Sequence, residues 1–357
     1  MLLAKLVTNK KVNTNRGSSM KSFNEIIYDV TKFGRKIKTS DYMGNGKYPI
    51  IDQGKNLISG YTNEENGIFV DVPAIIFGDH TRILKYIDTP FFLGADGTKI
   101  LKAKNENCNL KFIYYALKNI KIPDTGYNRH YKWLKESSII YPAIEHQDKI
   151  VNILDRITSI ITLKKQQLVF LEKLKHSLFV EMFGDKAHIL TMNDLCNIIT
   201  DGTHQSPKFV SDGIPFLFVS NVSENKISYD TGKFISIDTY KELYKRTPIE
   251  KYDILLSTVG SYGHPAIVKS NKKFLFQRHI AYLKPKKELI NSIYLHAAIL
   301  SDEVQRQIES KVKGIAQKTL NLSEIKTLKI PLPSMTEQNI FATIVEKIDK
   351  HKLLIID

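Results

Sequence analysis

Short segments of this chain combine cations, aromatic rings and amide groups in the manner of a nucleic-acid contact. The run RHYKW at 129–133 interleaves three possible cations with two aromatic rings and follows the Gly/Asn turn at 125–128. An arginine can bind a guanine edge through two hydrogen bonds, and a lysine can hold a phosphate. In the alternative interpretation Tyr131 and Trp133 belong to the core and the cations are only solvated.

Polar loops elsewhere have the same character. The loop DHTR at 79–82 follows the apolar run AIIFG, and STVGSYGH at 257–264 follows DILL at the corresponding place in the second half of the chain. Such groups can hydrogen-bond base edges, although most polar loops only satisfy their own turns. The residues that we expect to contact DNA are Lys55, His80, Thr81, Arg82, Asn128, Arg129, His130, Lys132, His204, Gln205, Ser206, Ser257, Thr258, Ser261, Tyr262, Gln277, Arg278, Gln317 and Lys318.

The charge of the chain is distributed in a way that suits a polyanionic partner. Among 357 residues the net charge is +15. Residues 21–144 carry 18 basic and 13 acidic groups and residues 186–334 carry 21 and 14, whereas 145–185 carry six of each. The excess therefore lies in two globular stretches and in the first 20 residues, and not in the segments that follow the globular stretches. A generally basic proteome is the alternative explanation.

Composition excludes several protein classes. Hydrophobic residues make up 42% and charged residues 25%, as in a folded globular protein. No apolar run approaches the roughly 18–20 residues of a membrane helix, and the N-terminus lacks the apolar core of a secretory signal. The two cysteines are far apart, which argues against a disulfide framework or a cysteine-ligated zinc site and favours the reducing cytoplasm.

We find no convincing catalytic site. The chain lacks a Walker A motif, a Gly-rich dinucleotide or S-adenosylmethionine fingerprint, an Asn-Pro-Pro-aromatic motif and His-Glu-x-x-His. Two Glu-x-Lys triplets, at 309–311 and 324–326, could be half of a metal-dependent nuclease site with Asp302 as a further acid. Such triplets arise by chance in a chain this rich in charge, and we expect no metal site.

One long helix is expected between the two globular stretches. Residues 145–183 contain no Gly or Pro, and apolar residues recur on a heptad track that Lys164 and Lys175 interrupt. A seam this narrow indicates coiled-coil pairing with another helix, over a length of roughly 55–60 Å. The residues expected to pair are Ile150, Leu154, Ile157, Ile161, Leu168, Leu171 and Leu178, with Ile344 and Ile348 from a second helix.

The chain also repeats itself. The segment IIYPAIEHQ at 139–147 matches IPLPSMTEQ at 330–338, with Pro and Gln displaced by the same 191 positions. Upstream, YPII at 48–51 resembles IPFL at 214–217, and each copy also has a helical stretch, at 110–118 and 293–309. The collinear order of these matches indicates a duplication, and Ser334 with Glu337 supplies a capping box for the second long helix.

We therefore expect an α+β fold with an internal pseudo-two-fold repeat: two tandem β-rich recognition domains, each followed by a long helix, and the two helices paired as an antiparallel coiled-coil spacer. The expected segments are a flexible N-terminal extension at 1–21, domains at 22–144 and 186–334, and helices at 145–185 and 335–357.

With the motifs DGTHQSP at 201–207, GYNRHYKW at 126–133 and the repeated Pro…Gln segment, this layout resembles the specificity subunit of type I restriction–modification systems over residues 22–357. The resemblance implies that each domain reads a short half-site in double-stranded DNA and that the helices act as a ruler. It also implies that the chain itself is non-catalytic. Two modification (methyltransferase) subunits and a restriction/translocase subunit are the implied partners, and these would bind S-adenosylmethionine, ATP and Mg.

Three features depart from the expected pattern. His146 stands where the second copy has Glu337, the first 19 residues have no counterpart that we can place, and the second helix is shorter than the first and can pair with only part of it. Two other functions stay open: a stand-alone DNA-binding or regulatory protein of the same fold, and a nuclease that uses the Glu-x-Lys triplets.

Overall fold

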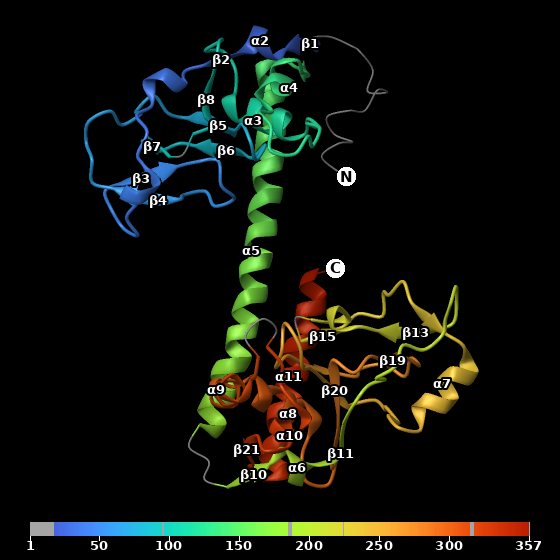
Figure 1. Ribbon diagram of the computed structural model, residues 1–357. Coiled ribbons are helices and arrows are strands. Elements are labelled where there is room, and N and C mark those ends of the chain that lie inside the picture. Colours follow the sequence, from blue (N-terminus) through green and yellow to red (C-terminus); the bar gives the residue numbers. More distant parts are fainter. Residues whose placement is uncertain (1–17, 95, 185–187, 224, 315–317, 357) are drawn as a thin grey trace. The chain divides into compact units, whose positions relative to one another are not determined.

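The computed structural model describes residues 18–94, 96–184, 188–223, 225–314 and 318–356 (Figure 1). The chain divides into two units, Met1–Ile161 and Thr162–Asp357. Each unit is described by itself. Among the described residues, no helix is both long and apolar enough to cross a membrane.

The first unit is built mainly from short strands. Its strands are β1 (Ser19–Ser22), β2 (Ile27–Asp29), β3 (Tyr48–Ile51), β4 (Gly60–Thr62), β5 (Ala74–Gly78), β6 (Leu84–Ile87), β7 (Phe92–Leu93), β8 (Thr98–Ala103) and β9 (Ser138–Tyr141). Its helices are α2 (Phe23–Ile26), η1 (Thr31–Phe33), η2 (Thr39–Asp41), α3 (Leu110–Lys118), α4 (Tyr131–Lys135) and the first part of α5 (Ile144–Phe183).

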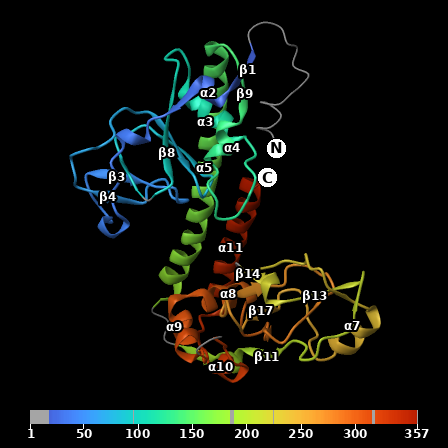
Figure 2. The same cartoon turned by 45° about the horizontal axis from the view of Figure 1, so that its top comes forward.

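Two sheets organise the first unit. One has the order β2-β8-β5-β6 with antiparallel neighbours, and its central strand β5 is buried along its whole length. The other has the order β4-β3-β7, in which β3 and β7 run parallel. Strands β1 and β9 pair separately, and Figure 2 shows them with α2 and α3 around the first turns of α5.

The second unit repeats this construction. Its strands are β10 (Ile189–Thr191), β11 (Cys196–Asp201), β12 (Phe209–Val210), β13 (Ile214–Leu217), β14 (Val222–Ser223), β15 (Lys226–Ile227), β16 (Phe234–Ile235), β17 (Ile254–Ser257), β18 (Pro265–Ile267), β19 (Leu275–Phe276), β20 (Ile280–Pro285) and β21 (Lys329–Pro331). Its helices are the remainder of α5, α6 (Met192–Leu195), η3 (Val219–Asn221), α7 (Ile237–Tyr244), α8 (Ser292–Leu300), α9 (Asp302–Lys311), α10 (Leu322–Lys326) and α11 (Met335–Ile356).

The strand orders confirm the predicted duplication. Sheet β11-β20-β17-β18 repeats β2-β8-β5-β6, and the parallel pair β13–β19 repeats β3–β7. The predicted matches 48–51 and 214–217 are the equivalent strands β3 and β13. The pair β10–β21 likewise repeats β1–β9.

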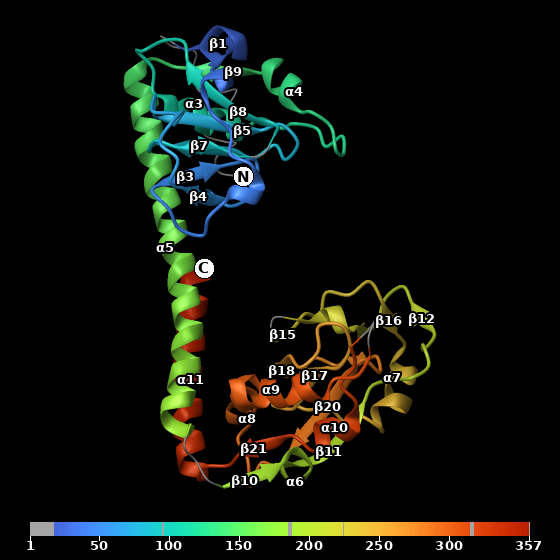
Figure 3. The same ribbon diagram turned by 60° about the vertical axis from the view of Figure 1, so that its left-hand side comes forward.

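Helix α11 pairs with α5 inside the second unit, and the two helices run antiparallel (Figure 3). The Phe341 ring lies 5.7 Å from Phe179 and 5.5 Å from Phe183. Nearer the C-terminus, Asp349 accepts a hydrogen bond from Lys175 at 3.1 Å, and Lys352 pairs with Glu172. Residue numbers therefore rise along one helix as they fall along the other, as predicted for an antiparallel coiled coil.

Two expected boundaries differ from the structure. Residues Ser19–Ser22 form β1, which pairs with β9, although we expected a flexible extension up to residue 21. Residues 1–17 lie outside the described part. The helix expected at 293–309 is two helices, because Ser301 breaks the first and caps the second by accepting a hydrogen bond from the Val304 N–H.

The apolar heptad positions of α5 also differ in what they pack against. Ile150 and Leu154 pack into the core of the first unit with Phe112, so our expectation that they pair with another helix is wrong there. Ile157 and Ile344 are half-buried, Ile348 is buried and Ile161 is 49% exposed. Leu168, Leu171 and Leu178 are half-buried in the second unit.

Candidate nucleic-acid interface

In the first unit, two of the predicted loops are joined through Asp79, the first residue after β5. Its backbone carbonyl accepts a hydrogen bond from the His130 N–H at 2.8 Å, and its buried carboxylate accepts one from the Tyr131 N–H at 2.7 Å. Segments about 50 residues apart in sequence are thereby held side by side. The predicted residues His80, Thr81, Arg82, Asn128 and Arg129 all lie on these two loops.

His130 itself is buried completely, so our expectation that it contacts DNA is wrong. Its Nδ1 lies 3.0 Å from the Asp79 carbonyl and its Nε2 lies 3.3 Å from the Thr125 hydroxyl. Both ring nitrogens are therefore occupied inside the protein. His130 positions the loops, whereas the neighbouring Arg129 is exposed.

The rim of this site contains a stacked ring pair. The rings of His80 and Tyr127 lie 4.6 Å apart and almost parallel, and Tyr127 is 87% exposed. Arg82 forms an ion pair with Asp124 at 2.8 Å, and its backbone adopts a φ of 62°. Hydrogen bonds from the Gly126 N–H and from Arg82 keep the pKa of Asp124 below its usual value, so the ion pair persists at neutral pH.

A third loop reaches the same rim. The Gln53 carbonyl accepts a hydrogen bond from the Thr81 hydroxyl at 2.6 Å, and its side-chain oxygen accepts one from the His80 N–H at 3.2 Å. The exposed Lys55 lies two residues further along this loop. Lys132 is also exposed, with its Nζ 4.8 Å from the Trp133 ring centre, whereas Tyr131 packs against Phe77 in the core.

In the second unit, four predicted segments converge. The Arg278 N–H donates to the Thr203 carbonyl at 3.1 Å, and the Thr258 N–H donates to the His279 carbonyl at 3.1 Å. The Leu320 N–H in turn donates to the Thr258 carbonyl at 2.9 Å. Lys318 lies at the start of that segment, and its predicted neighbour Gln317 lies outside the described residues.

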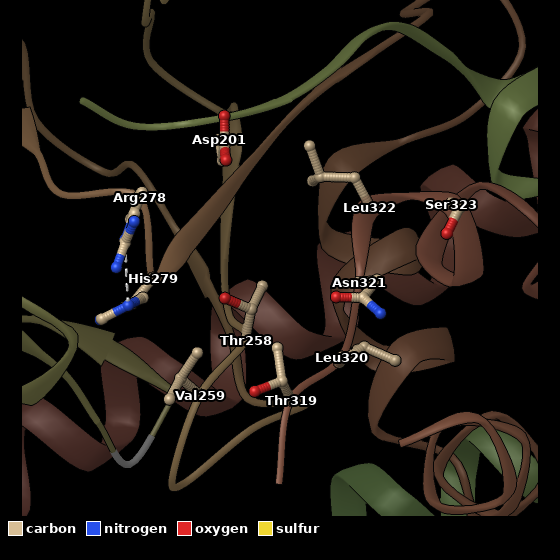
Figure 4. Close-up of a pocket in the computed structure, with 10 residues that line it drawn as sticks. All are labelled: Asp201, Thr258, Val259, Arg278, His279, Thr319, Leu320, Asn321, Leu322 and Ser323. Atoms are coloured by element: carbon tan, nitrogen blue, oxygen red, sulfur yellow. Dashed lines mark hydrogen bonds between the residues drawn. The ribbon is translucent and has the colours of Figure 1, made fainter. Parts of the chain in front are cut away.

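These segments surround a pocket of about 440 Å³ (Figure 4). Figure 4 shows Arg278 and His279 on one side, Asn321 and Ser323 on the opposite side, and Thr258 between them. Thr258 is only 5% exposed, so it lines the pocket but does not project from the surface. The pocket is lined by Asp201, Thr258, Val259, Arg278, His279, Thr319, Leu320, Asn321, Leu322 and Ser323.

Other predicted residues of this unit differ in accessibility. Ser257 is fully buried and its hydroxyl accepts a hydrogen bond from the His264 N–H at 3.1 Å, so our expectation of a DNA contact there is wrong. Tyr262 packs against the core, and Gln277 is half-buried. The exposed predicted residues are His204, Gln205, Ser206, Ser261, Arg278 and Lys318.

Several residues that hold or border these loops were not singled out from sequence. Arg246 follows α7 and forms an ion pair with Asp201, which also holds His204 at 2.8 Å. Gln53 and Asp124 brace the loops of the first unit, and Tyr127 is exposed at their rim. Only Tyr127 had a sequence signal, because it lies in the Gly/Asn turn at 125–128 and turns run over the protein surface.

The Glu-x-Lys triplets do not assemble a metal site in the described structure. The Glu324 carboxylate is paired with Lys313 at 3.1 Å and Lys311 at 3.7 Å, and Asp302 faces His176 at 3.4 Å. Within the residues that the structure describes, no group of three or more His, Cys, Asp or Glu side chains could hold a metal ion.

Two units of one topology, joined to paired antiparallel helices, define a tandem-repeat protein of mixed sheet and helix. A model of the family described as type I restriction modification DNA specificity domain matches residues 20–173 and 186–356. The chain belongs to this family and carries two copies of the domain.

Relatives and a solved structure agree with this assignment. The chain is 22% identical over 345 residues to the EcoR124I/EcoR124II specificity subunit of Escherichia coli, which covers 90% of this chain and 85% of that protein. It is 30% identical over 160 residues to the EcoBI specificity subunit of Escherichia coli, covering 45% of this chain but only 33% of that protein. The crystal structure of the S subunit of a type I restriction–modification system from M. genitalium has the same fold. The TM-score is 0.63 at 18% identity, with 97% of this chain and 92% of that chain covered.

Proposed function

We propose that this chain is the DNA specificity subunit of a type I restriction–modification complex and that each unit reads one half of a bipartite target. The observation that carries this proposal is a shared contact of the equivalent loops after β5 and β17. The Asp79 carbonyl accepts from the His130 N–H beside Arg129, and the Thr258 carbonyl accepts from the Leu320 N–H in the corresponding segment before β21. In the second unit the Thr258 N–H also donates to the His279 carbonyl, beside Arg278. Each unit thus presents an exposed arginine beside hydroxyl and amide groups, which is a base-reading combination.

Charge supports the same conclusion. The excess of basic groups lies in the two stretches that carry these loops, and the helical stretch 145–185 has equal numbers of basic and acidic groups. Phosphate contacts from lysines would position each unit, and the loop residues would specify the sequence.

The neutral helices suit protein partners. In the first unit, Ile153 and Ile160 of α5 are half exposed. In the second unit the exposed apolar side chains of the helix pair are Leu163, Val169, Phe170, Leu174, Val180, Ile340, Leu353, Leu354 and Ile356. Large exposed apolar patches mark interaction sites, so these side chains would suit a protein interface. We assign it to two modification subunits, with a restriction/translocase subunit completing the complex in the cytoplasm.

In this arrangement the chain performs no chemistry of its own. Methyl transfer, cleavage and translocation belong to the partners, which would bind S-adenosylmethionine, ATP and Mg. The contribution of this chain is to choose the DNA sequence and to hold its two halves in register.

A domain exchange tests the assignment of half-sites. Residues 22–142 would be replaced by the corresponding segment of another specificity subunit, and the complex with the modification subunit would be expressed in a host whose DNA is then sequenced for methylated bases. We expect one half of the methylated motif to change and the other half to stay. A change in both halves, or in neither, would contradict the proposal.

The docking surface is tested by Phe170→Asp, because Phe170 is 64% exposed and its replacement leaves the core of this chain intact. We expect the amount of modification subunit that co-purifies to fall at least tenfold. Gln166→Asp, at an exposed polar position of the same helix, is the matched control. Equal recovery with both variants would place the partners elsewhere.

A further inference from the structure

The turn between β19 and β20 holds Arg278 in a fixed place. The Arg278 N–H donates to Thr203, and the adjacent His279 carbonyl accepts from Thr258. Within the turn, the Ile280 N–H donates to the Gln277 carbonyl at 3.2 Å. Hydrogen bonds to two other segments and one within the turn therefore fix the backbone from which the guanidinium projects.

The guanidinium is oriented without being neutralised. Its Nε–H donates to Nε2 of His279 at 3.4 Å, and Arg278 is exposed at the rim of the 440 Å³ pocket. Two other arginines differ, since Arg246 is paired with Asp201 and Arg82 with Asp124, whereas Arg129 of the first unit is exposed. In the described part of the chain, Arg278 forms no ion pair with a carboxylate. Its terminal N–H groups are thus left for a ligand.

A guanidinium held at Nε presents its two terminal nitrogens as a fork. This fork matches the O6 and N7 acceptors of guanine in the major groove. An arginine fork also binds phosphate, so the fork alone does not separate the two ligands. The backbone of Arg278 is fixed by two other segments at the rim of a pocket lined by hydroxyl and amide groups, and this setting favours base reading over phosphate binding.

We propose that Arg278 reads a guanine in the half-site of the second unit, so that this half-site contains a G·C pair at a position that depends on Arg278. This inference rests on the proposed function, since it assumes that the second unit reads DNA. The ligand it adds is specific: the major-groove edge of one guanine, bound by the terminal N–H groups of Arg278.

The test measures binding of the complete complex, with its modification subunits, to duplexes that carry the methylated motif of the wild-type protein. Each base pair of the second half-site, identified by the domain exchange, is substituted in turn. We expect the wild-type complex to discriminate against loss of one G·C pair by about 5- to 150-fold. Arg278→Ala should bind the original and substituted duplexes within twofold of each other.

Two further variants sharpen the result. Arg278→Lys keeps the charge but loses the fork, so it should also lose discrimination at that position while retaining more affinity than Arg278→Ala. Arg306→Ala removes an exposed arginine of α9 in the same unit, and it should discriminate as the wild type does. Undiminished discrimination in the first half-site shows that each variant is folded and assembled.

The contrary outcomes are distinct. A second half-site without a G·C pair, or unchanged discrimination in Arg278→Ala, overturns the inference. A uniform loss of affinity with an unchanged ratio also overturns it, because Arg278 would then be a phosphate contact. In each of these cases the proposed function stands, whereas a methylation pattern that does not depend on this chain would overturn the proposed function itself.

Discussion

The side-chain oxygen of Gln147 accepts a hydrogen bond from the backbone N–H of Asn109 at 3.0 Å. The amide nitrogen of Gln147 donates to the Pro142 carbonyl at 2.8 Å, so one buried side chain clasps the start of α5 to the start of α3. The second unit repeats the clasp: Gln338 accepts from the Asn291 N–H at 2.8 Å and donates to the Pro333 carbonyl at 2.9 Å. The repeated Pro…Gln motif thus links the start of each long helix to its own domain.

Removal of this clasp should destabilise the chain. In Gln147→Ala, the partly buried N–H of Asn109 loses its partner, which should lower the free energy of unfolding by about 1–3 kcal/mol. Gln338→Ala should cost at least as much, since Gln338 also donates to the Leu289 carbonyl at 3.2 Å. Urea denaturation measures both, with Gln166→Ala at an exposed position as the control. A loss no greater than the control would show that the clasp carries no stability.

The N-terminus of α11 has a capping box and that of α5 does not, and two substitutions can give α5 the same cap. In α11, the Ser334 N–H and hydroxyl donate to the Glu337 carboxylate at 2.9 and 2.8 Å, forming a capping box. The equivalent positions before α5 are Ala143 and His146, which cannot form one. Ala143→Ser with His146→Glu should raise the free energy of unfolding of the first unit by about 0.5–1.5 kcal/mol, as read by hydrogen exchange at the start of α5. Ser334→Ala should lower the free energy of unfolding of the second unit by a similar amount. A double variant that destabilises the first unit, or a Ser334→Ala that stabilises the second, would contradict the comparison.

A charged contact interrupts the apolar seam between α5 and α11. Asp349 binds Lys175 at 3.1 Å and Lys269 at 2.9 Å. Burial opposes ionisation of Asp349, but the hydrogen bond from Lys269 and the charge of Lys175 outweigh it and hold its pKa below the usual value. Asp349→Ala removes one of the two carboxylate partners of Lys175, which keeps only Glu172 at 2.8 Å, and should cost about 1–3 kcal/mol of unfolding free energy.

The matched variant removes both charges of that contact. Lys175→Met with Asp349→Leu replaces the ion pair by apolar side chains, and its stability should return to within about 1 kcal/mol of the wild type. Chemical denaturation of the two variants side by side decides the point. If the double variant is no more stable than Asp349→Ala, the seam needs the ion pair itself.

Stability should also depend on pH through His296, whose Nε2 lies 3.2 Å from the Pro265 carbonyl. Burial, together with the charges of Lys175 and Lys269, lowers the pKa of His296 from 6.5 to about 4. His296 therefore takes up a proton near pH 6.5 in the unfolded chain but only near pH 4 in the folded chain. The free energy of unfolding should fall as the pH is lowered through this window, by up to about 3 kcal/mol. His296→Gln should flatten the dependence between pH 7 and 5, and an unchanged slope would assign it to other groups.

Much of the architecture could be predicted from sequence because it is encoded in local patterns. The absence of Gly and Pro from 145–183 predicted α5, and the paired prolines at 142 and 333 predicted the duplication. The segments that converge on the second interface were also identified from their polar loops.

The errors arose where a side chain is engaged by a neighbour whose proximity the sequence does not show. His130 looked like a DNA contact because the sequence does not show that Asp79, 51 residues earlier, occupies its ring nitrogen. Ser257 was misjudged for the same reason, since it binds the far end of its own loop at His264. Ile150 and Leu154 satisfy the heptad pattern, but α5 rests there on the core of its own domain.

The most direct test of the central claim is methylome sequencing of a host that expresses this chain with its modification subunit, compared with the same host without this chain. The account predicts a methylated motif of two short half-sites, separated by a gap of unread bases, that is present only when this chain is present. A methylation pattern that is identical in both hosts would contradict it and would favour a stand-alone DNA-binding protein of the same fold.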